Sequence, residues 1–271
     1  PSDMFLFRAS YQHAVRAPNF GELFAGGGSN PQYFDPCSAG TAMLTGVNAA
    51  AMAALCSATG VGGVGTFVQT PGTQVGLSTG GNTNLSPESA DTYTIGTVFT
   101  SPWDGIHLRA SIDYYNIAIK DPIIAPGVNQ VIAECYNYYG TNSTYNPLHP
   151  TCQSLQRAGG DILGIYGTGP NNTFPGINGG SIATSGVDIQ VDYDLDLGSA
   201  GNVHFNALLN RLLEWKQRDS DANAQFPNGL PTLDFAGTVG FFGEGLGQSF
   251  PEWKLNLNTA WTIGDFTFNM R

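Results

Sequence analysis

The sequence predicts an all-β fold: a partial transmembrane antiparallel β-barrel of about seven long strands, with long extracellular loops and short periplasmic turns. Three observations predict it. Gly (36), Phe (16) and Tyr (11) are abundant while only 11% of residues are charged, apolar and polar residues alternate in long runs, and the connections alternate between long and short. Soluble domains contain about a quarter charged residues, so we expect something other than water to contact much of this surface.

The alternation indicates strands, because successive side chains of a strand point to opposite faces. It is clearest over residues 187–196. The apolar members are Val187, Ile189, Val191, Tyr193 and Leu195, and the polar members are Asp188, Gln190, Asp192, Asp194 and Asp196. The aspartates extend over roughly 26 Å at 3.3 Å per residue, too far to converge on one ion or one bond. They are expected to line a hydrated lumen.

The same pattern predicts seven strands. In chain order they cover residues 4–16, 90–100, 106–119, 182–196, 202–214, 252–263 and 266–271. The complete ones exceed the 5–6 residues of an ordinary strand and reach the roughly 9–11 residues that cross a bilayer with tilt. Aromatic rings are enriched at membrane interfaces, and several lie near the predicted strand ends: Tyr11, Phe99, Trp103 and Trp261.

The connections between these strands separate into two kinds. Long loops cover 17–89, 120–181 and 215–251, and tight turns cover 101–105, 198–201 and 264–265. Outer-membrane barrels have this asymmetry, whereas soluble sandwiches mix loop lengths at both ends. Short helices are expected inside the long loops at 48–57, 128–139 and 152–157. The stretch 60–84, rich in Gly and Thr, is expected to be mobile unless a ligand or a neighbouring loop orders it.

The long loops also contain the cysteines and the ligand candidates. Four cysteines allow three pairings, and loop closure favours the local one, Cys37 with Cys56 and Cys135 with Cys152. Loop aromatics can stack on sugar or catecholate rings while a phenol donates a hydrogen bond. The candidates are Tyr33, Phe34, Tyr136, Tyr138, Tyr139, Tyr145 and Trp215. The alternative interpretation is that these rings pack on one another around the disulfides.

Several function classes are disfavoured by the sequence. The net charge of −11 and the absence of a basic run make nucleic acid an improbable partner. No apolar stretch has the roughly 20 residues that a membrane-spanning helix requires. We find no catalytic signature and no cysteine or histidine spacing typical of a zinc site, so neither an enzyme nor a cofactor is predicted.

Five segments together resemble a known family. They are Arg16-Ala17-Pro18 with Glu22-Leu23-Phe24, Asn84-Leu85-Ser86-Pro87-Glu88, Asp113-Tyr114-Tyr115-Asn116, Ser185-Gly186-Val187-Asp188 and Pro251-Glu252-Trp253-Lys254. Their order and spacing are similar to the barrel of TonB-dependent outer-membrane receptors. The residues that match the family motifs are Arg16, Pro18, Glu22, Leu85, Pro87, Glu88, Gly186 and Asp188.

The resemblance implies that residues 1–271 form an incomplete barrel domain in the outer membrane of a Gram-negative bacterium, without the plug domain and the final strands. It implies active uptake of a scarce nutrient: a siderophore-like iron chelate, cobalamin or an oligosaccharide. The implied partners are outer-membrane lipid, the TonB energy-coupling complex through an N-terminal part, and an extracellular ligand. Two alternatives stay open: a passive porin and, less favoured, a soluble β-sandwich adhesin.

Overall fold

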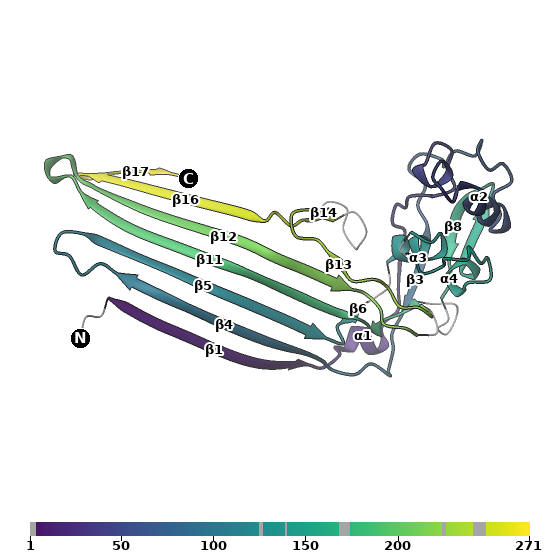
Figure 1. The fold of residues 1–271 in the computed structure, drawn as a ribbon, viewed down its shortest axis with the longest axis horizontal. Helices are drawn as coiled ribbons and strands as arrows, with labels where there is room; N and C mark the ends of the chain where they lie inside the picture. The colour runs from purple at the N-terminus through teal and green to yellow at the C-terminus, as the bar shows by residue number, and fades with distance from the viewer. Residues whose placement is uncertain (1–3, 125–126, 139, 168–173, 224–225, 241–247) are drawn as a thin grey trace.

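The computed structural model describes residues 4–124, 127–138, 140–167, 174–223, 226–240 and 248–271. Its largest element is an antiparallel sheet in which seven strands are hydrogen-bonded in chain order, with β1 and β17 at the edges (Figure 1). The strands are β1 (Phe5–Arg16), β4 (Glu88–Thr100), β5 (His107–Lys120), β11 (Ser181–Asp196), β12 (Asn202–Arg218), β16 (Trp253–Ile263) and β17 (Phe266–Met270). The seven predicted strands are confirmed. β12 runs beyond its predicted end because its last residues still pair with the start of β11, and Lys216 and Gln217 also pair with β13 (Leu233–Asp234).

The two ends of this sheet differ, as the connection lengths predict (Figure 1). At the short-turn end, tight connections join β4 to β5, β11 to β12 and β16 to β17. Gly198, Gly201 and Gly264 adopt φ values of 59°, 89° and 55° in two of these turns, a region that side chains with a Cβ rarely adopt. At the opposite, long-loop end, all the long connections leave the sheet.

The register gives the sheet one apolar face, because like residues lie side by side across the strands. One row contains Phe5, Phe99, Ala110, Val191, Ala207 and Leu257, and the next contains Phe7, Thr97, Ile112, Ile189, Leu209 and Leu255. These side chains are partly or largely exposed, and Phe7 is 79% exposed. The apolar face therefore needs a covering that the described residues do not supply.

The opposite, polar face has hydrogen-bonded pairs of side chains on neighbouring strands. Arg8 on β1 reaches Asp113 on β5 at 2.5 Å, passing over Gly96 of the strand between them. Any Cβ at position 96 would collide with the Asp113 carboxylate, so glycine is required there. On β11, Asp188 accepts a hydrogen bond from Asn210 of β12 at 2.7 Å.

The described residues of two long loops, 17–87 and 121–180, fold together into one body, which we call the loop module (Figure 1). Its five-stranded sheet contains β2 (Gly27–Ser29), β3 (Gly76–Gly80), β7 (Leu155–Ala158), β8 (Asp161–Ile165) and β9 (Phe174–Pro175). Its helices are α2 (Ala49–Ala58), α3 (Val128–Cys135) and α4 (Pro150–Gln153), with a short 3-10 turn, η1 (Ala42–Leu44). β3 comes from the first loop and pairs in parallel with β8 and β9 of the second.

Smaller elements complete the long-loop end. They are α1 (Phe20–Phe24), β6 (Ile123–Ile124), β10 (Ile177–Asn178), β14 (Val239–Gly240) and β15 (Gln248–Ser249), and a further 3-10 turn, η3 (Gly198–Ala200), lies at the short-turn end. β6 pairs with β10, and β14 pairs with β15. Asn19 caps α1 by accepting from the Glu22 N–H, while the Glu22 carboxylate accepts from the Asn19 N–H. The sequence analysis did not predict this helix.

The buried core lies in the loop module and not in the main sheet, whose two faces are both open here. Its fully buried side chains include Met52, Leu55, Val75, Val131, Ile132, Ile162, Ile165 and Phe174, and Phe226 of the third long loop joins them. The stretch 60–84 contributes Val61 and Val75 to this core and contains β3. The neighbouring loop thus orders this stretch, which was expected to be mobile only without a ligand or a neighbouring loop against it.

The helix predictions hold only in part. α2 lies within one residue of its prediction, but α3 ends at Cys135 and not at 139. The helix predicted over 152–157 is wrong: α4 starts earlier, with Pro150 in its first turn, and ends at Gln153. Leu155–Ala158 forms β7 instead, because its backbone pairs with β8. Among the residues described, no helix is long and apolar enough to cross a membrane.

Candidate ligand-binding site

Two disulfides close segments of the loop module. Cys37 is bonded to Cys56 of α2, and Cys135 of α3 is bonded to Cys152 of α4. The pairing is the local one that loop closure favours, and it leaves no free cysteine in the described chain. All four cysteines are buried in the core cluster. Each disulfide therefore fixes a helix to the interior of the module.

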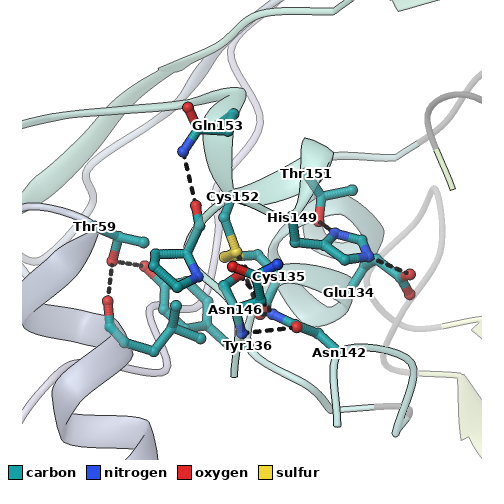
Figure 2. Close-up of a disulfide and its surroundings, with 12 residues drawn as sticks. Thr59, Glu134, Cys135, Tyr136, Asn142, Asn146, His149, Thr151, Cys152 and Gln153 are labelled. Atoms are coloured by element: carbon teal, nitrogen blue, oxygen red, sulfur yellow. Dashed lines mark hydrogen bonds and ion pairs between the residues drawn. A yellow bond between two sulfur atoms is a disulfide. The ribbon is translucent and has the colours of Figure 1, made fainter. Parts of the chain in front are cut away.

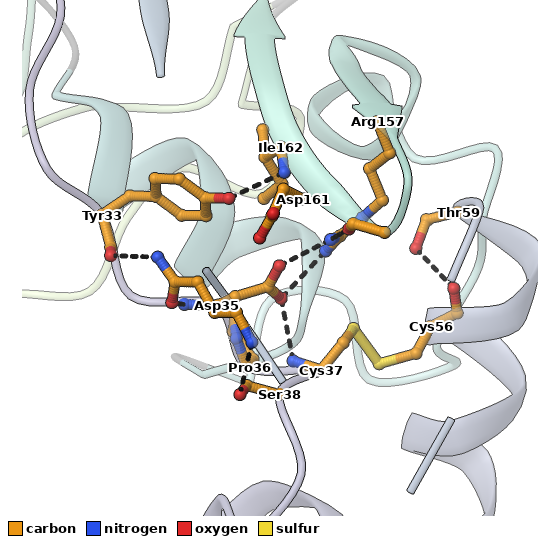
Figure 3. A network of polar contacts seen from close by, with 12 residues as sticks. Tyr33, Asp35, Pro36, Cys37, Ser38, Cys56, Thr59, Arg157, Asp161 and Ile162 are labelled. Carbon is orange, nitrogen blue, oxygen red and sulfur yellow. Dashed lines mark hydrogen bonds and ion pairs between the residues drawn. A yellow bond between two sulfur atoms is a disulfide. The ribbon is translucent and has the colours of Figure 1, made fainter. Parts of the chain in front are cut away.

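A buried ion pair joins the two loops (Figure 3). The Arg157 guanidinium of β7 donates to both carboxylate oxygens of Asp35, at 2.5 and 3.0 Å, and the two side chains are 2% and 0% exposed. Asp35 also accepts from the Cys37 N–H at 2.9 Å. Arg157 further donates to the Gly160 carbonyl and to the Tyr136 hydroxyl. A carboxylate and a guanidinium this deeply buried need each other, because an unpaired buried charge is costly.

Two tyrosines among the ligand candidates belong to this network and not to the surface. Tyr33 is buried, and its hydroxyl accepts from the Ile162 N–H at 2.7 Å; burial raises the pKa of Tyr33 to about 12. Tyr136 is fully buried, and its hydroxyl lies 2.7 Å from the Thr59 hydroxyl. In this structure both rings pack in the core around the disulfides, which is the alternative interpretation of these candidates.

Four other aromatic candidates lie at or near the surface. Phe34 and Tyr138 are 45% and 52% exposed, and Tyr145 is half-buried against the core. Trp215 lies at the long-loop end of β12, where its ring packs on Phe250 at 4.9 Å between centroids. Its indole N–H is buried and finds no acceptor in the described part of the chain. The remaining candidate, Tyr139, lies outside the described residues.

Around the second disulfide lies a further buried acidic group (Figure 2). Glu134 of α3 is fully buried, and the Thr141 hydroxyl donates to its Oε2. Its Oε1 lies 3.6 Å from Nε2 of His149, which is also buried. Desolvation raises the pKa of Glu134 and lowers the pKa of His149. No group of three or more potential ligands for a metal ion occurs among the residues described.

One arginine brings together the motif residues at the long-loop end of β1 and β4. Arg16 donates to the Glu88 carboxylate at 2.6 and 3.0 Å and to both oxygens of Glu22 at 3.0 Å. Glu88 in turn accepts from the Ile123 N–H at 3.0 Å. This network connects the ends of two neighbouring strands, β1 and β4, to α1 and β6. Leu85 is buried nearby, Pro18 is half-buried and Pro87 is exposed.

The remaining motif residues, Gly186 and Asp188, lie on the polar face of β11. A Cβ on Gly186 would collide with the Tyr115 hydroxyl of β5, so this position requires glycine. The register between β11 and β12 shifts between Ser185 and Gly186. Of the other aspartates predicted to share this face, Asp192 accepts from Asn206 and Asp194 lies 2.7 Å from a His204 ring nitrogen.

A cavity of about 350 Å³ lies between α1, β3 and β6, where the loop module meets the main sheet. Small residues and two isoleucines form most of its wall, with three polar side chains among them. Its lining residues are Asn19, Gly21, Glu22, Ala25, Thr79, Gly80, Ile123, Ile124 and Gly176. The Glu22 carboxylate is already held by Arg16, so the cavity carries no free charge from that side chain.

Sequence reasoning missed the charged residues that organise the module. Asp35 and Arg157 are 122 positions apart, and no local pattern joins them. One signal was present in the sequence: Asp35 and Glu134 lie within two residues of a cysteine in a chain with only 11% charged residues. In a charge-poor segment next to a buried cysteine, a carboxylate is a candidate for burial with a partner.

Comparison with known proteins gives one family and several distant structures. The family described as TonB dependent receptor-like β-barrel matches residues 1–271. The chain is similar to the siderophore receptor PirA from Pseudomonas aeruginosa, at 16% identity and a TM-score of 0.44, over 99% of this chain and 32% of that chain. It is also similar to the ferric enterobactin receptor PfeA from the same organism, at 13% identity and a TM-score of 0.43, over 97% and 24%.

A third similar structure is the Serratia marcescens hemophore receptor HasR in complex with its hemophore HasA and heme. It is 11% identical, with a TM-score of 0.45, over 98% of this chain and 28% of that chain. The chain thus spans about a third or less of the length of these structures. A search of curated proteins found no match.

Proposed function

This chain belongs to the family of TonB-dependent receptor-like β-barrels, and from that premise we propose that it forms part of an outer-membrane receptor for TonB-coupled uptake of a scarce nutrient. The supporting observation is the division of the sheet into an apolar and a polar face, with the loop module at one end. In the proposed arrangement, lipid covers the apolar face, the polar face lines the lumen and the loop module lies outside the cell.

The dimensions of the apolar face support this arrangement. A row through Tyr11 and Tyr93, whose rings lie 4.9 Å apart, bounds it toward the loops, and a row through Trp261 and Phe268 bounds it toward the turns. On β11 these rows correspond to Ser185 and Leu195. Ten residues at 3.3 Å with the usual tilt near 40° give a height of about 25 Å, the height of the apolar band in outer-membrane barrels.

Ligand capture is assigned to the loop module. Phe34 and Tyr138 expose aromatic rings on a body that two disulfides and a buried ion pair hold rigid. Rigid aromatic rings bind ligands at a low cost in conformational entropy. The proposed ligand classes are a siderophore-like iron chelate, cobalamin or an oligosaccharide. Residues 1–271 are proposed to be part of the barrel domain, with the plug domain and the TonB contact supplied by other parts of the receptor.

Uptake by the complete receptor, expressed in a strain that lacks it, tests the proposal. The probes are a ferric tris-catecholate, cyanocobalamin and a short maltooligosaccharide, each radiolabelled and measured with and without TonB. We expect one probe to accumulate only when TonB is present. The double change of Phe34→Ala with Tyr138→Ala should raise the half-saturating concentration at least about tenfold, the loss of roughly 1.4 kcal/mol of binding energy.

The matched control is Phe7→Ala, which removes an exposed ring on the apolar face and should leave the half-saturating concentration unchanged. Uptake that is independent of TonB and proportional to probe concentration would contradict the proposal and favour a passive porin. TonB-dependent uptake with unchanged affinity in the double variant would retain the receptor and remove Phe34 and Tyr138 from the ligand site.

A further inference from the structure

The buried side chains of Glu134 and His149 lie together beside the Cys135–Cys152 disulfide (Figure 2). Glu134 Oε1 and His149 Nε2 face each other at 3.6 Å, and neither atom has a hydrogen-bond partner in the described structure. Their other polar atoms are occupied: Glu134 Oε2 accepts from Thr141, and His149 Nδ1 lies 2.8 Å from the Thr151 hydroxyl. A small rotation of either side chain would therefore form a direct hydrogen bond between the two.

The number of protons on this pair sets its net charge. With one proton the pair is neutral, either as carboxylic acid with imidazole or as carboxylate with imidazolium. With none it carries a buried negative charge, and with two a buried positive charge. Both charged states are unfavourable in a site that is almost closed to water, because burial disfavours an uncompensated charge.

The surrounding charged groups do not compensate a net charge on the pair. Arg157, which contacts the neighbouring Tyr136, is neutralised by Asp35. Asp219 of the third long loop accepts a hydrogen bond from Gln130 of α3 and brings a further negative charge to this helix. Among the described residues, His149 is the basic side chain that lies within 4 Å of the Glu134 carboxylate.

We propose that Glu134 and His149 form a pH-sensitive latch, which keeps the Cys135–Cys152 segment of the loop module closed while the pair shares one proton. The position of the pair supports this coupling. Glu134 immediately precedes Cys135 on α3, and His149 immediately precedes α4, which contains Cys152. A net charge on the pair therefore acts directly on the contact between these two helices. The inference rests on contacts inside the loop module and does not depend on the ligand.

The pH window follows from the direction of each shift. Once the segment opens, Glu134 and His149 return toward ordinary pKa values near 4.3 and 6.5. The raised pKa of Glu134 makes its contribution to closure decline as pH rises, and the lowered pKa of His149 makes its contribution decline as pH falls. The open segment binds fewer protons than the closed pair above about pH 6.5 and more below about pH 4.3. Closure is thus most favourable between these limits.

The test measures how fast each disulfide is reduced in the complete receptor in outer-membrane vesicles. A phosphine reductant is added between pH 4 and pH 9, the released thiols are alkylated, and both disulfides are quantified by peptide mass spectrometry. The rate for Cys135–Cys152 is divided by the rate for Cys37–Cys56, so that the pH dependence of the reductant cancels. We expect this ratio to be lowest near pH 5.5 and to rise at least about threefold by pH 8.5.

Two variants and one control identify the groups responsible. Glu134→Gln, which keeps the shape of the side chain, should abolish the rise toward alkaline pH. His149→Gln should abolish the rise toward acidic pH and retain the alkaline one. The control Glu214→Gln removes a partly exposed acid paired with Lys216 on β12 and should behave as the unchanged receptor. A ratio that does not vary with pH, or an alkaline rise that persists in Glu134→Gln, would overturn the proposal.

Discussion

Removing the Arg157 side chain is expected to open the loop module without affecting the main sheet. In the Arg157→Met change, Asp35 loses both of its guanidinium hydrogen bonds and keeps the one from the Cys37 N–H. Because Asp35 is fully buried, water cannot replace the lost partner while the module stays closed. The carboxylate must then be neutralised by a proton, or the segment around it must open.

The size of the effect follows from the burial of the pair. Removing one partner of a buried ion pair costs about 3–5 kcal/mol, whereas exposed pairs are worth 0–1 kcal/mol. At 1.4 kcal/mol per factor of ten, the closed loop module should become less favourable by a factor of roughly 10² to several thousand. The double change Arg157→Met with Asp35→Asn should recover part of this loss, because no buried charge is then left without a partner.

Amide hydrogen exchange of the complete receptor in detergent, followed by mass spectrometry, measures this effect. Peptides that contain 33–37 and 155–165 should exchange at least about a hundredfold faster in Arg157→Met, while peptides from β11 and β12 stay unchanged. The matched control is Arg218→Met, since Arg218 pairs at the surface with Asp221 and should change exchange little. Unchanged protection of both loop peptides in Arg157→Met would refute the reasoning, because it would mean that the buried pair does not hold the loops together.

Three further predictions concern the two faces, a disulfide and a phenol. Val191→Arg should reduce the free energy of folding into a bilayer by roughly 2–4 kcal/mol in a refolding titration, and Asp192→Arg should cost less, because it lies on the polar face. Equal costs would contradict the assigned faces. Replacing Cys135 and Cys152 together by serine should lower the stability of the loop module by about 3 kcal/mol, because the open chain then gains loop entropy. Denaturant-dependent proteolysis measures this loss. Non-reducing peptide mapping of the unchanged receptor is the control. Tyr33 should stay protonated until about pH 12 in an ultraviolet titration. Its contribution to stability is therefore present below pH 10 and is lost as pH rises through about 12. Ionisation near pH 10 would show that the ring is exposed.

The sequence by itself determined the main sheet, its faces and its two ends. An alternation of apolar and polar residues with a period of two predicts strands of this length, and it also assigns Val191 and Asp192 to opposite faces. Tight turns need glycine at positive φ, and Gly198, Gly201 and Gly264 can be read directly from the sequence. Neighbouring strands pair in chain order, so local pattern and overall topology coincide. Loop closure likewise favours the local cysteine pairing that the structure contains.

Only the tertiary structure decided the interior of the loop module. Tyr33 and Phe34 are adjacent in the sequence, yet one is buried and the other is exposed, because burial depends on β8 from a different loop. The segment after Cys152 looked helical by its local pattern, but pairing with β8 made it a strand. The contact of Asp35 with Arg157, 122 residues away, is likewise invisible to any window of sequence. Periodicity records which face a residue occupies, whereas contacts between distant loops depend on how those loops meet, which no local pattern encodes.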